Sequence, residues 1–190
     1  MLIPTFADWD RCEIVRHTSV YPNHSIGLHL YAAAYAAAKR VDEPQIVEIG
    51  FWKGYTAAMM LCGMFDAGSG GRLLSVDNGT CEEGLVNIRG LPNELHKLFD
   101  FHQGNSDSPE TIQRVQQNAK CFGGLDLLFL DGGDTAMRNK DVLTYAPMMK
   151  QGGVIICHDS NMFDCETVDL GAYRGLAVIP QPVKWKSKMF

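Results

Sequence analysis

The sequence predicts an α/β fold built on a doubly wound, mostly parallel β-sheet. Short apolar runs rich in branched side chains have the length and composition of buried strands. Stretches of about ten residues with helical composition alternate with these runs. Such an alternation needs crossover connections, which are right-handed and place helices on both faces of a parallel sheet.

The expected strands are short, apolar for the most part, and followed by glycine or a polar residue. They cover residues 45–49, 72–76, 100–103, 125–130, 154–157 and 176–179. The glycine-rich break at 67–71 separates the second strand from the preceding helix. Pro180 and Pro182 follow the sixth strand and argue against much further regular structure.

The expected helices are rich in good helix formers and are bounded by turn residues. They cover residues 31–40, 56–65, 91–99, 109–120 and 139–149. Alanine dominates the first, and the turn at 42–44 stops it. Pro109 stands at the first position of the fourth, with Asp107 or Ser108 as its cap. Pro147 interrupts the fifth helix late.

Composition excludes several classes of protein. The chain has 190 residues, 46% hydrophobic and 21% charged, which are ordinary values for one globular domain. A net charge of −5 without a long basic stripe makes nucleic acid an unexpected partner. No apolar run is long enough to cross a bilayer, and no secretory signal is visible. Six scattered cysteines without a C-x-x-C pair indicate a reduced, cytoplasmic protein.

Polar residues follow the predicted strands in step. Glu48 and Asp77 close the first two strands, Asn105 follows the third, Asp131 the fourth, and the pair His158–Asp159 the fifth. Ligands of open α/β sheets bind beyond the carboxyl ends of the strands. These residues therefore predict one shared site.

The loop from the first strand into its helix indicates what this site binds. Gly50 allows a tight turn, and Gly54 either lets a ligand approach the backbone or serves packing. Asp77 stands where an acid accepts hydrogen bonds from a ribose hydroxyl. The loop lacks the G-x-G-x-x-G pattern, and Glu48 adds negative charge, which suits a ligand with a cationic part. S-adenosylmethionine fits these residues better than NAD.

The sequence resembles the class I methyltransferases that use S-adenosylmethionine, which have a Rossmann-like fold. It is similar more narrowly to the small-molecule O-methyltransferases grouped with macrocin O-methyltransferase and cephalosporin hydroxylase. The resemblance rests on VEIG at 47–50 with GYTA at 54–57, LSVD at 74–77, GNS at 104–106, and DLLFLDG at 126–132 with GGVIICHD at 152–159.

The resemblance implies a role for each matched position. The expected cofactor-binding residues surround the methionine, ribose and adenine parts in turn; they are Glu48, Gly50, Gly54, Tyr55, Thr56, Asp77, Asn78, Asn105, Ser106 and Asp131. The alternative for residues 105–108 is a helix-capping loop, and both interpretations can hold together.

Three interpretations of the end of the fifth strand stay open. In the first, Asp131, His158 and Asp159 bind Mg²⁺, which orients and acidifies an acceptor hydroxyl. In the second, His158 is a metal-free general base. In the third, His158 is a structural residue at a strand end. Asp131, His158 and Asp134 are the catalytic candidates, although Asp134 replaces the family's usual histidine and could instead cap the next helix.

The expected domain spans residues 1–190, with an N-terminal helical lid over 1–44, a cofactor-binding core over 45–160 and a shortened C-terminal extension over 161–190. The lid would bring aromatic and histidine side chains toward a small hydroxylated acceptor, a sugar or a natural-product precursor; they are Trp9, His17, Tyr21, His24 and His29, which packing and surface roles also explain. Apolar residues near either end would suit a homo-oligomer. The alternative functions are a nicotinamide-dependent oxidoreductase and a non-catalytic cofactor-binding or assembly protein.

Overall fold

The computed structural model describes residues 25–158 and 177–179, with only the backbone described for 25–30, 135 and 177–179. Its helices are α3 (Ser25–Lys39), α4 (Tyr55–Asp66), α5 (Glu82–Arg89), α6 (Asn93–His96), α7 (Pro109–Cys121), α8 (Thr135–Tyr145) and the short 3₁₀ helix η1 (Ala146–Met148). Its strands are β1 (Gln45–Ile49), β2 (Arg72–Asp77), β3 (Phe99–Gln103), β4 (Leu125–Leu130), β5 (Met149–Cys157) and β6 (Ala177–Ile179).

The described strands form one sheet in the order β3-β2-β1-β4-β5-β6, and every neighbouring pair is parallel. The strand order reverses between β1 and β4, which places the switch point of the sheet there. The predicted doubly wound sheet is therefore confirmed.

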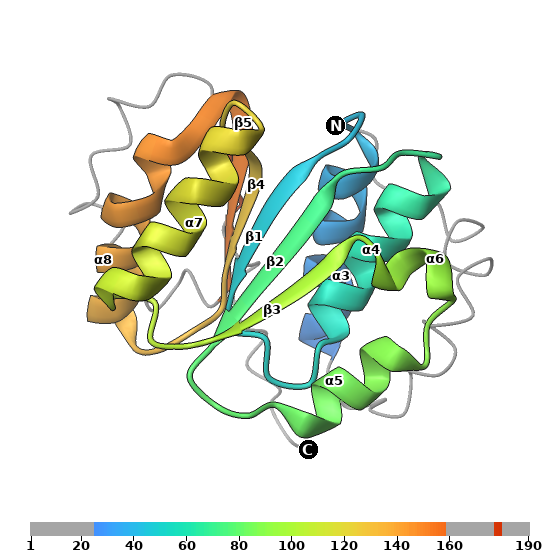
Figure 1. Cartoon of the computed structure of the whole chain (residues 1–190), viewed down its shortest axis with the longest axis horizontal. Helices are drawn as coiled ribbons and strands as arrows, with labels where there is room; N and C mark the ends of the chain where they lie inside the picture. Colours follow the sequence, from blue (N-terminus) through green and yellow to red (C-terminus); the bar gives the residue numbers. More distant parts are fainter. Residues whose placement is uncertain (1–24, 159–176, 180–190) are drawn as a thin grey trace, which may run out of the picture.

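Helices cover both faces of this sheet (Figure 1). On one face α3, α4, α5 and α6 pack on side chains such as Ile46, Leu73 and Phe129. On the other face α7 and α8 pack on the alternate side chains of the same strands, including Val47 and Leu128. Because β1 and β4 are buried and mostly apolar, they form the centre of the sheet and fix its carboxyl edge.

Helices α3 and α4 lie side by side and run in the same direction. Tyr35, in the second half of α3, donates a hydrogen bond from its hydroxyl group to Asp66 at the end of α4. A Cβ atom added to Gly63 would lie 2.4 Å from the carbonyl oxygen of Tyr35. The two backbones therefore approach closely, and the first half of α3 lies toward the carboxyl edge of the sheet.

Most predicted elements match the structure to within a few residues, but the region from 80 to 99 does not. The expected helix over 91–99 is wrong, because α6 begins only after its N-cap Pro92, ends at His96, and is followed by β3 from Phe99. The sequence analysis also missed α5, a short polar helix with only Gly84 and Ile88 buried.

The helix expected over 139–149 begins earlier and ends earlier than predicted. The side chain of Asp134 accepts a hydrogen bond from the backbone amide of Met137 at 2.9 Å, so α8 begins at Thr135. Pro147 lies in η1, and β5 already begins at Met149. The cap of α7 is Ser108, whose hydroxyl accepts a hydrogen bond from the amide of Thr111.

Two further predictions concern the redox state of the cysteines and the presence of membrane-spanning segments. The described cysteines Cys62, Cys81, Cys121 and Cys157 are thiols and form no disulfide with one another. Among the described helices, none has the length and apolar character required to span a membrane.

Candidate functional site

A cavity of about 260 Å³ opens where the parallel strands end. The loops after β1, β2, β3 and β4 line it, together with one side chain from α8; the lining residues are Ile49, Gly50, Val76, Asp77, Asn78, Gly104, Asn105, Ser106, Asp131, Gly132, Gly133 and Met137. The cavity thus lies at the switch point between β1 and β4, where open α/β sheets bind ligands.

The carboxylate of Asp77 is held by backbone amides of two loops. Its Oδ2 atom accepts hydrogen bonds from the amides of Phe51 and Trp52, both at 2.9 Å, and its Oδ1 atom from the amide of Gly79 at 2.8 Å. Burial alone would raise the pKa of Asp77, but these amides and the thiol of Cys81 outweigh it and lower the pKa. The carboxylate is therefore ionised at neutral pH, with most of its acceptor capacity already used.

The loop that binds Asp77 carries an exposed aromatic side chain. Trp52 has a left-handed backbone with φ of 43°, and its side chain is 68% exposed. The ammonium group of Lys53 lies 5.2 Å from the centroid of the indole ring and 3.1 Å from a carboxylate oxygen of Glu83 on α5. A non-glycine residue in this conformation is uncommon, and functional sites are where such strain accumulates.

Gly50 lies in the loop after β1, at the switch point of the sheet, where it packs against the backbone of the loop after β4. Its φ is 94°, and a Cβ atom there would lie 2.6 Å from the carbonyl carbon of Asp131. Only glycine fits this position without moving the loop after β4. Gly54 has a packing explanation instead, because an added Cβ would meet the ring of Phe51 at 2.8 Å.

Glu48 is a fully buried carboxyl group beside this site. Ser75, its neighbour in register on β2, donates a hydrogen bond from its hydroxyl to Oε2 at 2.5 Å. The Oε1 atom has no hydrogen-bond partner among the described residues. Burial raises the pKa of Glu48 well above its usual value, the Ser75 hydroxyl opposes this, and Asp131 and Asp77 raise it further.

Asp131 and His158 meet at the ends of β4 and β5. The Nδ1 atom of His158 lies 2.8 Å from Oδ1 of Asp131, and both side chains are partly exposed. Arg138, which is 7% exposed on α8, donates hydrogen bonds to the carbonyl oxygens of Gly132 at 2.9 Å and His158 at 2.7 Å. This buried guanidinium group connects the loop after β4 to the turn after β5.

A tyrosine from α3 also faces this end of the site. Burial raises the pKa of Tyr31, and Asp131, Tyr55 and Glu48 raise it further because all three are close to its phenol group. This placement agrees with the parallel packing of α3 on α4, which directs the first half of α3 to the carboxyl edge of the sheet. Two phenol groups and two carboxyl groups therefore lie close to one another beside the site.

A family model of methyltransferase domains matches residues 47–160, which is well over half of the chain. The chain belongs to this methyltransferase family. The match covers all loops that line the cavity, so the cavity is part of the methyltransferase domain. No curated protein matches the sequence.

Solved structures share the fold of this methyltransferase domain at low sequence identity. An O-methyltransferase from Bacillus cereus is 17% identical over 82% of this chain and 67% of its own, with a TM-score of 0.55. A methyltransferase from Podospora anserina is 15% identical over 81% of this chain and 61% of its own, with a TM-score of 0.52. The O-methyltransferase TomG from Streptomyces achromogenes is 15% identical over 82% and 66%, with a TM-score of 0.51.

The structure brings most predicted site residues of the methyltransferase domain to one edge. Asp77, Asn78, Asn105, Ser106 and Asp131 line the cavity. Glu48 and Tyr55 do not line it, but like Asp131 they lie close to the phenol group of Tyr31. Thr56 is buried at the start of α4. The narrower resemblance to the macrocin O-methyltransferase group stays a prediction.

Some predicted residues lie elsewhere or outside the described part of the chain. Asp134 is exposed and caps α8, as one of its two interpretations predicted. Asp159 lies outside the described residues, as do Trp9, His17, Tyr21 and His24 and the side chain of His29. Within residues 25–158, no group of three or more histidine, cysteine, aspartate or glutamate side chains could hold a metal ion.

The sequence analysis missed four residues of this site: Tyr31, Met137, Arg138 and Asp141. Met137 lines the cavity, and Asp141 is buried on α8 close to Ser106. Met137 and Arg138 lie four and three residues before Asp141, so both are its neighbours on the surface of α8, and a helical projection from Asp134 onward would have grouped them. Tyr31 gave a weaker signal in an alanine-rich helix.

Proposed function

We propose that this methyltransferase domain binds S-adenosylmethionine and transfers its methyl group to an oxygen atom of a small hydroxylated molecule. The observation that most supports this proposal is the cavity at the switch point, which has the Asp77 carboxylate at one end and the Asp131–His158 pair at the other. The Bacillus cereus enzyme with bound S-adenosylhomocysteine and the Streptomyces achromogenes enzyme with bound S-adenosylmethionine, which is involved in tomaymycin synthesis, support this proposal.

The donors and acceptors that line the cavity fit the nucleoside part of this cofactor. Asp77 holds the loop after β1 and offers its remaining acceptor capacity to a ribose hydroxyl. Asn105 and Ser106 provide polar groups for the edge of the adenine, and the Met137 side chain provides an apolar contact for its face. The cavity itself is about the size of the nucleoside, and the methionine part would extend toward Glu48 and Tyr31.

The carboxyl groups at the other end suit a cationic ligand. Glu48 and Asp131 raise the pKa of Tyr31, so their negative potential reaches across this end of the site. A bound ammonium or sulfonium group would favour the ionised form of Glu48, whose Oε1 atom has no partner among the described residues. When bound, S-adenosylmethionine supplies an electrophilic methyl group and a neutral thioether leaving group.

His158 is the proposed general base. Its Nδ1 atom forms an ion-pair contact of 2.8 Å with Oδ1 of Asp131, and the negative charge of this carboxylate favours a proton on Nδ1, which leaves Nε2 as an acceptor. As the acceptor oxygen forms its bond to the methyl carbon, Nε2 takes the proton of that hydroxyl group. Arg138 holds both loops and thereby fixes this pair. Base catalysis of this kind contributes roughly 10²–10⁴-fold to a rate.

The described donors fit Mg²⁺ poorly. Mg²⁺ prefers an octahedral set of oxygen ligands, whereas among the described residues Glu48 is fully buried and the Asp131 carboxylate already contacts the imidazole of His158. We therefore derive no step through a metal. Full methyl transfer in excess EDTA is the expected result, and loss of turnover that Mg²⁺ restores would contradict it.

Calorimetry with S-adenosylhomocysteine tests the binding part of the proposal. We expect saturable binding with one site per chain, and a thermal shift with this ligand but none with NAD. No binding at millimolar S-adenosylhomocysteine would overturn the proposal.

Transfer of a labelled methyl group from S-adenosylmethionine to a panel of sugars and phenols tests the chemistry. His158→Gln should keep the affinity for S-adenosylhomocysteine and lose turnover by about two orders of magnitude or more. Unchanged turnover in this variant would remove His158 as the base.

A further inference from the structure

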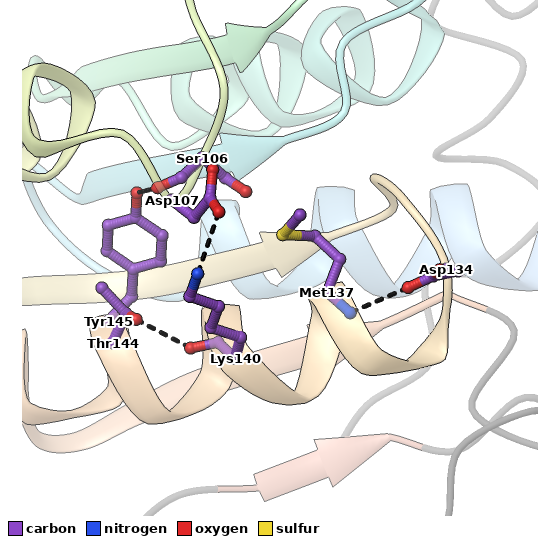
Figure 2. A network of polar contacts seen from close by, with 7 residues as sticks. All are labelled: Ser106, Asp107, Asp134, Met137, Lys140, Thr144 and Tyr145. Carbon is purple, nitrogen blue, oxygen red and sulfur yellow. Dashed lines mark hydrogen bonds and ion pairs between the residues drawn. The ribbon is translucent and has the colours of Figure 1, made fainter.

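Helix α8 holds the loop after β3, on the nucleoside side of the cavity (Figure 2). The hydroxyl group of Tyr145 donates a hydrogen bond to the carbonyl oxygen of Ser106, and the ammonium group of Lys140 lies 2.9 Å from Oδ2 of Asp107. Ser106 itself lines the cavity. The position of this loop is therefore set by side chains of α8.

Asp141 lies on the same helix, four residues before Tyr145, and is only 1% exposed. Neither of its carboxylate oxygens makes a well-aligned hydrogen bond among the described residues, although the hydroxyl of Ser106 is near enough to lower the pKa of Asp141. Leaving a buried polar group unpaired destabilises the folded state, and more strongly when the group is charged. A carboxyl group in this place is thus unfavourable for stability, and asparagine of the same size would avoid the charge.

The surroundings of Asp141 contain both signs of charge. Burial raises the pKa of Asp141 to about 6; the hydroxyl of Ser106 opposes this, Asp107 raises the pKa further, and Lys140 and Arg138 lower it. The phenol of Tyr145 faces the same region, and Asp141 raises its pKa in turn. Asp141 therefore changes charge close to neutral pH, next to the hydroxyl of a residue that lines the cavity.

We propose that Asp141 is a positioning residue for the nucleoside site, whose carboxylate accepts a hydrogen bond from the hydroxyl of Ser106 when the cofactor is bound. This inference rests on the proposed function. The bond provides the partner that the buried carboxylate lacks without ligand. It also fixes the Ser106 hydroxyl so that the lone pairs of its oxygen are free to accept a hydrogen bond from the adenine of the cofactor. Tyr145 and Lys140 hold the rest of the loop, so only the Ser106 side chain has to turn.

Cofactor binding and ionisation of Asp141 are then linked. A hydrogen bond to the carboxylate lowers the pKa of Asp141 in the bound state, so binding releases a proton wherever the free protein still holds it. Affinity should therefore be highest above the pKa of the free protein, about 6, and fall as the pH decreases below it. If binding lowers this pKa by about one, the full tenfold loss of affinity is reached only below both pKa values, so we expect a loss of about fivefold between pH 7.5 and pH 5.

Calorimetric titration of the full chain with S-adenosylhomocysteine, from pH 5 to pH 7.5, tests this inference. The wild type should lose affinity toward pH 5 and should release protons at pH 6, measured in two buffers of different ionisation enthalpy. Asp141→Asn should bind about tenfold more weakly at pH 7.5 and lose less affinity toward pH 5 than the wild type, since an amide oxygen accepts a weaker hydrogen bond and does not titrate.

Asp100→Asn is the matched control. It removes a carboxylate from β3 that pairs with Arg114 at the surface, away from the cavity lining, and should follow the wild-type profile. The other ionisable residues of the site, Glu48 among them, are the same in all three proteins, so they do not produce a difference between the profiles.

The outcomes separate the two proposals. A pH profile that is the same in the wild type and Asp141→Asn, or equal affinity of the two at pH 7.5, overturns the role of Asp141 and leaves the proposed function standing. No binding by the wild type at any pH overturns the proposed function and this inference with it.

Discussion

The Oδ2 atom of Asp77 accepts a hydrogen bond from the backbone amide of Trp52 at 2.9 Å, across 25 residues of sequence. The same atom accepts a second bond from the amide of Phe51. The residue at the end of β2 thus holds the loop after β1 in the shape that forms one wall of the cavity. A residue predicted for ligand binding also organises the site before any ligand arrives.

Asp77→Asn should weaken binding of S-adenosylhomocysteine by about 10–100-fold. The backbone amides of the two loops donate to both carboxylate oxygens of Asp77, whereas an asparagine side chain is neutral and offers a single acceptor oxygen. Calorimetry measures this loss. Retained affinity in Asp77→Asn would show that the loop keeps its shape without the carboxylate.

Arg138→Met should lower the free energy of unfolding by about 2–4 kcal/mol, since two carbonyl groups lose a charged donor while the apolar stem is kept. Arg138→Lys keeps the charge but not both bonds, and should lie between the wild type and Arg138→Met. Urea unfolding of the three proteins gives the order. Equal stability of Arg138→Met and the wild type would contradict the bridging role.

Gly63→Ala should destabilise the protein by about 1–3 kcal/mol, because its Cβ would lie 2.4 Å from the backbone of α3. Gly70→Ala is the control: a Cβ there lies 3.5 Å from its nearest neighbour, and Gly70 has no left-handed backbone. The difference between their thermal midpoints measures the close packing of α3 and α4. Similar midpoints would mean that the helices separate at little cost.

Glu48→Gln should change how stability depends on pH. The pKa of Glu48 in the folded protein is raised well above 4.5, so the folded state binds more protons than the unfolded state once the pH exceeds 4.5. Stability of the wild type therefore falls as the pH rises through this window, and the variant should lose that dependence and be the more stable protein at pH 7. Chemical unfolding at pH 4.5 and pH 7 measures it; parallel pH profiles would exclude a buried ionisable carboxyl at this position.

The sheet and the residues at its carboxyl edge were predictable from local patterns. β1 and β4 are short, buried and mostly apolar; Glu48 is the penultimate residue of β1, and Asp131 directly follows β4. Because parallel strands all end at one edge, a residue such as Asp77 or Asp131 could be placed in the site from its position in the chain alone.

The contacts of α8 could not be found in this way. Arg138 and Asp141 look like ordinary polar residues of a surface helix, and only the packing of α8 on the loops after β3 and β4 buries them. The four-residue helix α6 and the polar helix α5 escaped for a related reason, since neither has a broad apolar face. Local patterns identify elements with a wide buried side and miss those held by single contacts.

The exposed indole of Trp52 provides an optical signal for the cavity. The backbone amide of Trp52 donates a hydrogen bond to the carboxylate of Asp77, which lines the cavity. A ligand that moves the loop after β1 therefore alters the solvent around the indole ring. The chain has two other tryptophans, Trp9 and Trp185, and replacing both by phenylalanine leaves a protein with a single emitter. Its fluorescence would follow occupation of the site in stopped-flow experiments, without a label and before any methyl acceptor is known.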